Sequence, residues 1–95
     1  MYVADFVWRS EVVEKIAVKH QLTQDEVEEV FFNRPRFRFL EPGRHTPGED
    51  VYSAEGQTAA GRYITVFFIL KVTGDALILS ARDMTARERR RYRRK

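Results

Sequence analysis

The hydrophobic positions of the first twenty residues follow two patterns in turn. Residues 2–8 (YVADFVW) are rich in β-branched and aromatic side chains, which predicts a first strand. Residues 11–20 place apolar side chains at the spacing of one helix face, and Ser10 can cap the helix that this spacing predicts. The apolar stripe consists of Val12, Val13, Ile16 and Ala17. A strand and an amphipathic helix are therefore expected to open the chain.

A second helix is predicted to begin at a capping box formed by Thr23 and Glu26. In this motif the hydroxyl and the carboxylate each accept a hydrogen bond from a backbone N–H at the helix start. The helix continues through Val30 and Phe31. It ends at Asn33-Arg34-Pro35, because proline disfavours helical backbone in the residue that precedes it.

The remaining apolar runs have the lengths and spacing of strands. Residues 36–40 alternate Arg with Phe, which predicts Phe inward and Arg outward, and residues 41–50 form a Pro- and Gly-rich loop. Residues 51–57, 62–71 and 76–82 are further strands, joined by short turns that contain glycine. Because residues 62–71 are apolar on both faces, that strand should be central. The sequence thus predicts an α+β fold with the order β-α-α-β-β-β-β-α, in which an antiparallel meander precedes a terminal helix.

The last fifteen residues combine another capping box with a concentration of positive charge. Thr85 and Glu88 start a short basic helix that is predicted to run to about Arg93. The segment carries eight Lys/Arg against two acidic side chains, a net charge of +6, whereas the other eighty residues have a net charge of −3. This concentration favours a polyanion or an acidic partner, because each neutralised phosphate releases counterions. The alternative is a solvated tail that serves solubility.

Length and composition limit the class of protein. With 95 residues, 43% of them hydrophobic, the chain is expected to form one domain over residues 1–95. It has no cysteine, so disulfides and thiolate metal sites are excluded. The N-terminus lacks the pattern of a signal peptide, and the longest apolar run, residues 64–70, is far shorter than the roughly 20 residues of a membrane span. We therefore expect a small cytoplasmic protein.

Four local motifs occur in order along the chain. They are Phe6-x-Trp8; Lys19-His20 followed by a Glu-rich helix that ends at Val30-Phe31; the loop Arg44-His45-Thr46-x-Gly48-Glu49; and Ile78-x-Ser80-Ala81-Arg82 with Thr85, Glu88, Arg89 and Tyr92. Over nearly its full length the chain therefore resembles the BrnT family of bacterial type II toxins. The resemblance implies a RelE-like fold and an endoribonuclease that inhibits translation. It also implies a cognate DNA-binding antitoxin (BrnA-like), through whose complex any oligomer would form.

Two features depart from the pattern of that family. The family usually places Asp, Lys and Asn along the first helix, where this chain has Arg9, Val12 and Ile16. The loop Pro42-Gly43-Arg44-His45 also carries one additional glycine. If the missing polar residues shape the active site, this site is weakened or altered. A second hypothesis is therefore a catalytically degenerate member that serves as an antitoxin-binding or RNA-binding module.

Metal-independent RNA cleavage needs a base for the 2′-hydroxyl, an acid for the 5′-oxygen and fixed positive charge on the phosphoryl oxygens. His45 lies beside Arg44 in a loop that can present both side chains, and histidine ordinarily titrates near neutral pH. Glu49 could orient His45 or act as the base. The alternatives are an exposed loop histidine without a task, and a Glu49 that is solvated or paired with Arg44.

Further candidates lie at the ends of the predicted elements. Arg82 is the first candidate for a phosphate clamp, because guanidinium binds phosphate with two hydrogen bonds; the alternative is a salt bridge to Asp83 or Glu49. His20 is either catalytic or a partner of the last carbonyls of its helix. The candidate RNA-binding residues are Lys19, Arg36, Arg38, Arg62, Arg89 and Tyr92. With two histidines and no metal motif, neither a metal nor another cofactor is expected.

Overall fold

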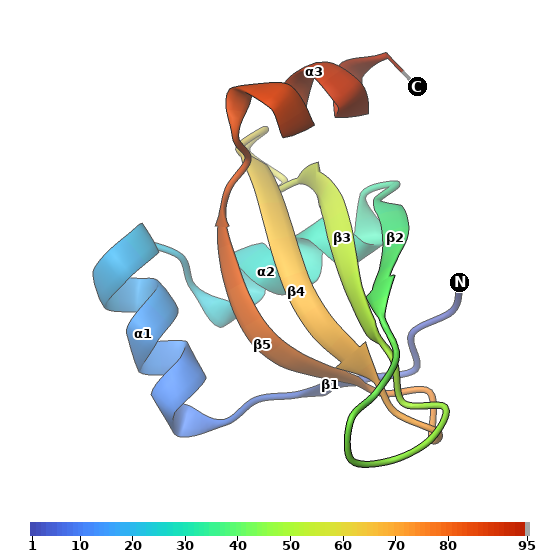
Figure 1. The fold of residues 1–95 in the computed structure, drawn as a ribbon. Coiled ribbons are helices and arrows are strands. Elements are labelled where there is room, and N and C mark those ends of the chain that lie inside the picture. The colour runs from blue at the N-terminus through green and yellow to red at the C-terminus, as the bar shows by residue number, and fades with distance from the viewer. Residues whose placement is uncertain (95) are drawn as a thin grey trace.

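The computed structural model describes residues 1–94, which form three helices and one five-stranded sheet (Figure 1). The elements are β1 (Phe6–Val7), α1 (Ser10–His20), α2 (Gln24–Phe32), β2 (Arg36–Glu41), β3 (Val51–Gln57), β4 (Tyr63–Leu70), β5 (Ala76–Asp83) and α3 (Ala86–Arg93). The predicted α+β class and the predicted order of elements are confirmed. The first strand is shorter than expected, because only Phe6 and Val7 pair with the sheet.

The strand order in the sheet is β1-β5-β4-β3-β2, so β4 is central as predicted. Strands β2 to β5 form the predicted antiparallel meander, whereas β1 lies parallel to β5 and makes the sheet mixed. Helices α1 and α2 pack against one face of the sheet. Helix α3 lies across one end of the sheet, and the 42–50 loop lies at the opposite end (Figure 1). The face opposite α1 and α2 is therefore left open between α3 and this loop.

The core forms between the two N-terminal helices and the covered face of the sheet. Ile16, Leu22 and Val30 are fully buried against Val66 and Phe68. Burial of each such side chain stabilises the fold by about 1.5–3 kcal/mol. The sequence motif Phe6-x-Trp8 also serves this packing: the Phe6 ring contacts Phe31 with 5.0 Å between centroids, and the Trp8 indole donates to the Glu28 carboxylate at 2.8 Å.

Local signals at the helix ends are mostly confirmed. Both capping boxes, at Thr23 and Thr85, are present with reciprocal hydrogen bonds. The prediction that Ser10 caps α1 was wrong: Ser10 is the first helical residue, Arg9 precedes it, and no side chain caps this end. At its other end, helix α1 is capped by Gln21, which adopts a left-handed conformation and donates its N–H to the Ala17 carbonyl.

The Arg/Phe alternation of β2 buries only one of its two Phe side chains. Phe37 packs against the core, but Phe39 is 56% exposed, so the prediction that both rings point inward was wrong for Phe39. The reason is that β2 is an edge strand, so one side of Phe39 is left open, while its ring packs against that of Tyr52 with 5.9 Å between centroids. A bulge at Leu40 then shifts the register before Glu41.

Candidate active site

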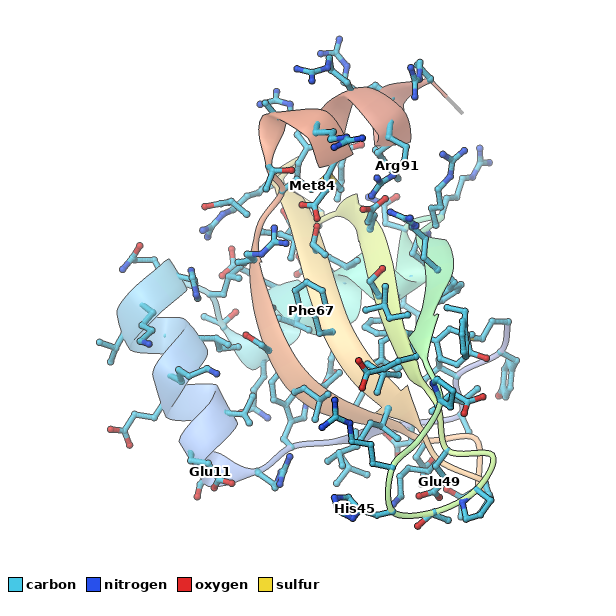
Figure 2. The ribbon with its side chains drawn as sticks, in the orientation of Figure 1. Glu11, His45, Glu49, Phe67, Met84 and Arg91 are labelled. Carbon is cyan, nitrogen blue, oxygen red and sulfur yellow. The ribbon has the colours of Figure 1, made fainter. Side chains whose placement is uncertain are left out.

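The open face of the sheet is built from cross-strand rows of side chains. The row beside α3 consists of Arg36, Glu55, Thr65 and Arg82, one residue from each of β2, β3, β4 and β5. The next row consists of Arg38, Ser53, Phe67 and Ser80. The third row lies beside the 42–50 loop and includes Val51, Ile69 and Leu77. Figure 2 shows Phe67 in the middle of this face, Arg91 and Met84 at the α3 end, and His45 and Glu49 at the loop end. The candidate residues are therefore divided between two ends of one surface.

A hollow of about 430 Å³ lies at the loop end of the open face. It is lined by Arg9, Glu41, Gly43, Arg44, His45, Thr46, Glu49, Val51, Ile69, Lys71 and Leu77. Three of the five predicted catalytic residues, Arg44, His45 and Glu49, thus share this hollow, which we call the loop hollow. Arg9 and Lys71 join them from distant parts of the sequence. Sequence reasoning missed Lys71, although an antiparallel meander necessarily brings the end of β4 beside the start of β3.

Glu49 anchors the 42–50 loop. Its side chain is only 8% exposed; one carboxylate oxygen accepts from Lys71 Nζ at 2.9 Å and the other from the Val72 N–H at 3.0 Å. The hydrogen bond from Val72, followed by that from Lys71, lowers the pKa of Glu49 below its usual value. The expectations of a solvated acid or a partner of Arg44 were therefore wrong, because both oxygens are used within the protein.

The additional glycine of the loop has a structural reason. The N–H of Gly43 donates to the Asp50 carboxylate at 3.0 Å, which closes the loop on itself. A Cβ atom at Gly43 would lie 2.0 Å from the Glu49 carbonyl oxygen, far inside van der Waals contact. Only glycine allows this close approach of two backbone segments. Gly43 thus fixes the loop that carries Arg44 and His45.

Arg44 and His45 point into solvent-accessible space. Arg44 is paired only loosely with Glu41, at 3.4 Å, and its side chain is 80% exposed. Across the described residues the His45 side chain makes no hydrogen bond, so Glu49 does not orient it. The hollow combines the cations Arg9, Arg44 and Lys71 with two carboxylates. The lining therefore has one cation more than it has acids, which suits a bound phosphate; this third cation, Arg9, lies 3.9 Å from the exposed Glu11 carboxylate.

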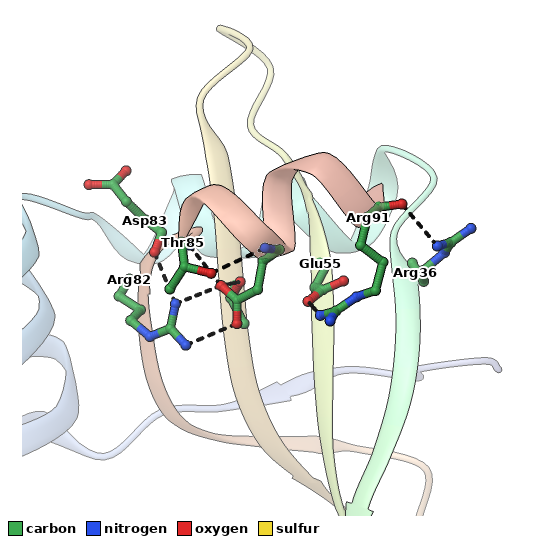
Figure 3. Close-up of polar contacts among 8 residues, drawn as sticks. Arg36, Glu55, Arg82, Asp83, Thr85 and Arg91 are labelled. Atoms are coloured by element: carbon green, nitrogen blue, oxygen red, sulfur yellow. Dashed lines mark hydrogen bonds and ion pairs between the residues drawn. The ribbon is translucent and has the colours of Figure 1, made fainter. Parts of the chain in front are cut away.

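Arg82 lies at the other end of the open face and is held by Glu88 (Figure 3). Its guanidinium donates to the two Glu88 oxygens at 2.8 and 3.1 Å and to the Asp83 carbonyl at 3.1 Å. The hydrogen bonds from Arg82, followed by those from Thr85 and Thr65, lower the pKa of Glu88 to about 2. Neither the Asp83 carboxylate nor Glu49 is the ion-pair partner of Arg82, contrary to the alternative that the sequence suggested.

The structure does not bring His45 and Arg82 to the same phosphate. Arg82 stands opposite Thr65, whereas the loop hollow is lined by Ile69, four residues further along β4. At about 3.3 Å per residue, this spacing separates the two rows by roughly 13 Å. His20 does not line the loop hollow either: Arg9, which does, precedes α1, whereas His20 is the last residue of that helix.

Two of the predicted RNA-binding arginines hold helices in place. Arg62 donates to the Asp83 carboxylate at 2.8 and 3.2 Å and to the carbonyls of His20 and Gln21 at 2.6 and 2.8 Å, which ties α1 to the sheet. Arg36 donates to the Arg91 carbonyl at 3.2 Å. These bonds give both side chains structural roles.

Arg91 is paired with Glu55, a carboxylate on β3 that is only 1% exposed (Figure 3). Sequence reasoning missed this acid. A charged residue inside an otherwise uncharged strand, in a chain with a basic terminal helix, was the available signal. The pair pins the second half of α3 to the sheet, as Arg82 and Glu88 pin the first half.

The rest of α3 divides into a packed side and an open side. Tyr92, a candidate for RNA binding in the sequence, is buried, and its ring lies 6.1 Å from that of Tyr63, so it packs the helix against the sheet. Arg89 lies over the Tyr63 ring at 4.2 Å. Arg87, Arg90, Arg93 and Arg94 are exposed, and within residues 1–94 none of them forms an ion pair. Lys19 and Arg38 are likewise exposed without an acidic partner in the described chain.

Two classes of site are not seen in the described residues. Residues 1–94 contain no group of three or more His, Asp or Glu side chains that could hold a metal ion. None of the helices in this range has the length and apolar character needed to cross a membrane.

Comparison with known families defines the class of this protein. Residues 8–88 match the family described as ribonuclease toxin, BrnT, of type II toxin–antitoxin system. The class is therefore that of type II ribonuclease toxins, which act on RNA and are paired with an antitoxin. The match spans most of the chain, and the protein belongs to the BrnT family, as the four sequence motifs predicted. No curated protein matches the chain.

Proposed function

We propose that this protein is a metal-independent endoribonuclease that cleaves RNA in the loop hollow and thereby inhibits translation in the cytoplasm. The observation that supports the proposal is the gathering of Arg9, Arg44 and Lys71 around His45 from three separate segments. Cleavage of RNA requires a proton acceptor beside fixed positive charge, and this hollow contains both.

In the proposed reaction His45 takes the proton of a ribose 2′-hydroxyl. The 2′-oxygen then attacks the adjacent phosphorus, the bond to the 5′-oxygen breaks, and a 2′,3′-cyclic phosphate and a 5′-hydroxyl are formed. Arg9, Arg44 and Lys71 stabilise the charge that develops on the phosphoryl oxygens. The departing oxygen is protonated by water, since the other titratable side chains of the hollow are of types (Arg, Lys and Glu) that ordinarily titrate far from neutral pH.

The RNA strand is proposed to cross the open face from the loop hollow toward α3. Arg38 lies between the two ends and is exposed. At the α3 end, the arginines without acidic partners provide further phosphate contacts, and neutralisation of phosphates there strengthens binding at low salt. Four other candidates stabilise this surface indirectly, because they hold α1 or α3 against the sheet: Arg36, Arg62, Arg82 and Tyr92.

One observation favours the second hypothesis, a binding module without catalysis. Val12 and Ile16, where family members usually carry polar side chains, are buried in the core. The first helix therefore supplies no polar side chain to the hollow at positions 12 and 16. In addition, His45 lacks an orienting partner among the described side chains. In both hypotheses we propose that the partner is a BrnA-like, DNA-binding antitoxin.

The two hypotheses are separated by one assay. A defined RNA is incubated with the purified protein in the presence of EDTA, with and without ribosomes, and the product ends are mapped. The ribonuclease proposal predicts 2′,3′-cyclic phosphate and 5′-hydroxyl ends. RNA that stays intact under all conditions, with folded protein bound to it, would leave the binding module as the function.

A further inference from the structure

We propose that the outer edge of β2 binds an extended segment of the antitoxin, which adds to the sheet as a sixth strand. The inference rests on the proposed function for the identity of that partner. It concerns a surface outside the loop hollow and follows from three features of β2: an unpaired edge, exposed aromatic side chains on one face and arginines on the other.

The edge is available and of sufficient length. Strand β2 is the last strand in the sheet, and within residues 1–94 no strand pairs with its outer side. Arg36–Phe39 run in continuous register with β3, and the bulge at Leu40 ends the regular stretch. The opposite edge strand, β1, has only two residues. Unpaired N–H and C=O groups on an edge strand are a template for another chain, so β2 is the better template.

Large apolar side chains collect at this edge on the side that faces the helices. Phe39 and Phe32 are exposed, and so is Tyr2. Beside them lies a hollow of about 230 Å³ that is lined by Phe31, Pro35 and Phe37 and by the N-terminal residues. Phe37, which lines the hollow, and Phe39 point to the same side of β2, so the exposed ring lies on the same face as the hollow. Exposed apolar surface of this kind marks a protein interface.

The other side of β2 is basic. Arg36 and Arg38 face the open side of the sheet, and the acid opposite Arg36, Glu55, is already paired with Arg91. An added strand would place its side chains directly beside these arginines. A segment in which acidic residues alternate with apolar ones would therefore match both faces of β2. RNA would match only the arginines.

A second copy of this chain fits the edge poorly. In an antiparallel pair of β2 strands, Arg36 and Arg38 of one copy would lie beside the same arginines of the other. Like charges placed opposite each other destabilise a sheet. The charge pattern therefore selects an acidic partner over self-association.

The test measures hydrogen exchange of this protein, alone and in complex with its cognate antitoxin. Strand addition predicts that the outward-pointing amides among residues 36–39, which do not bond to β3, gain protection of at least about tenfold in the complex. Docking through side chains elsewhere would leave these amides unchanged and would overturn the proposal. The same holds if the two proteins form no complex.

Substitutions test the two faces separately. Phe39→Ser and Arg38→Glu should each weaken antitoxin binding by about tenfold or more. The matched control is Val72→Ser, because Val72 is 75% exposed, against 56% for Phe39, and lies away from the edge. The proposal would be contradicted if Phe39→Ser bound the antitoxin as tightly as Val72→Ser and wild type. It would also be contradicted if Phe39→Ser and Val72→Ser lost affinity for the antitoxin to the same extent. Circular dichroism confirms folding of each variant.

The outcome is distinguishable from that of the proposed function. Phe39→Ser should cleave RNA at the wild-type rate, because Phe39 lies outside the loop hollow. A protein that leaves RNA intact but shows protected β2 amides would refute the ribonuclease and retain this interface. RNA that protects residues 36–39 in place of the antitoxin would assign the edge to the substrate and overturn the proposal.

Discussion

Arg82 on β5 and Glu88 on α3 are joined by two hydrogen bonds, at 2.8 and 3.1 Å. The same carboxylate accepts from the Thr85 N–H at 2.9 Å and from the Thr65 hydroxyl at 3.0 Å. Glu88 therefore completes the capping box of α3 and fastens that helix to two strands. The arginine that the sequence marked as a phosphate clamp is part of this attachment, and we propose the cleavage chemistry for the other end of the open face.

This attachment predicts a loss of stability in acid. The pKa of Glu88 lies near 2 in the folded protein, below its ordinary value of 4.5, so its contribution is fully present above pH 4.5 and is lost as the pH falls toward 2. Glu88→Gln should lower the free energy of unfolding at pH 7 by about 2 kcal/mol, and the difference from wild type should vanish near pH 2. Urea unfolding at a series of pH values measures this. Glu41→Gln, which alters an exposed surface pair, should cost no more than about 0.5 kcal/mol.

Arg62 should stabilise the fold without contacting RNA. Arg62→Ala removes the bonds to Asp83 and to the last carbonyls of α1, and the free energy of unfolding should fall by about 2–3 kcal/mol. The exposed Arg38 is the matched control, and Arg38→Ala should change stability by no more than about 0.5 kcal/mol. Chemical unfolding compares the two variants. Equal stabilities would show that the Arg62 clamp contributes little.

Gly43→Ala should disturb the loop hollow more than the fold. The added Cβ would meet the Glu49 carbonyl oxygen at 2.0 Å, so the backbone that carries Arg44 and His45 must shift. Misplacement by about 1 Å is expected to lower the cleavage rate by roughly tenfold to hundredfold. The neighbouring Pro42→Ala serves as control. A wild-type rate for Gly43→Ala would mean that catalysis does not depend on this loop conformation.

The exposed arginines of α3 and the adjoining Arg94, which form no ion pair within residues 1–94, should determine how RNA binding depends on salt. Replacing Arg87, Arg90 and Arg94 together with Gln should reduce the slope of log affinity against log salt by roughly 0.7 for each phosphate that is no longer neutralised. Fluorescence anisotropy with a single-stranded RNA at several salt concentrations measures the slope. The control, Lys15→Gln, removes an exposed cation on α1 and should leave the slope unchanged. An unaltered slope in the triple variant would remove α3 from the RNA surface.

Features determined by neighbouring residues were predictable from the sequence. The capping boxes at Thr23 and Thr85 depend on residues three positions apart, and β4 was placed at the centre of the sheet because it is apolar on both faces. The partners of Arg62, Glu49 and Glu55 were not predictable, because each pair joins elements that only the folded chain brings together. Lys71 was missed for the same reason, and the separation of His45 from Arg82 follows from the register of β4 and β5.

The most direct test of the account compares the two histidines in the RNA cleavage assay with EDTA. His45→Ala should abolish cyclic-phosphate products, because the loop hollow then has no side chain of a type that titrates near neutral pH. His20→Ala should cleave at the wild-type rate, since His20 lies at the far end of α1. Cleavage by His45→Ala at the wild-type rate, or loss of cleavage in a folded His20→Ala variant, would contradict the assignment of the active site to the loop hollow.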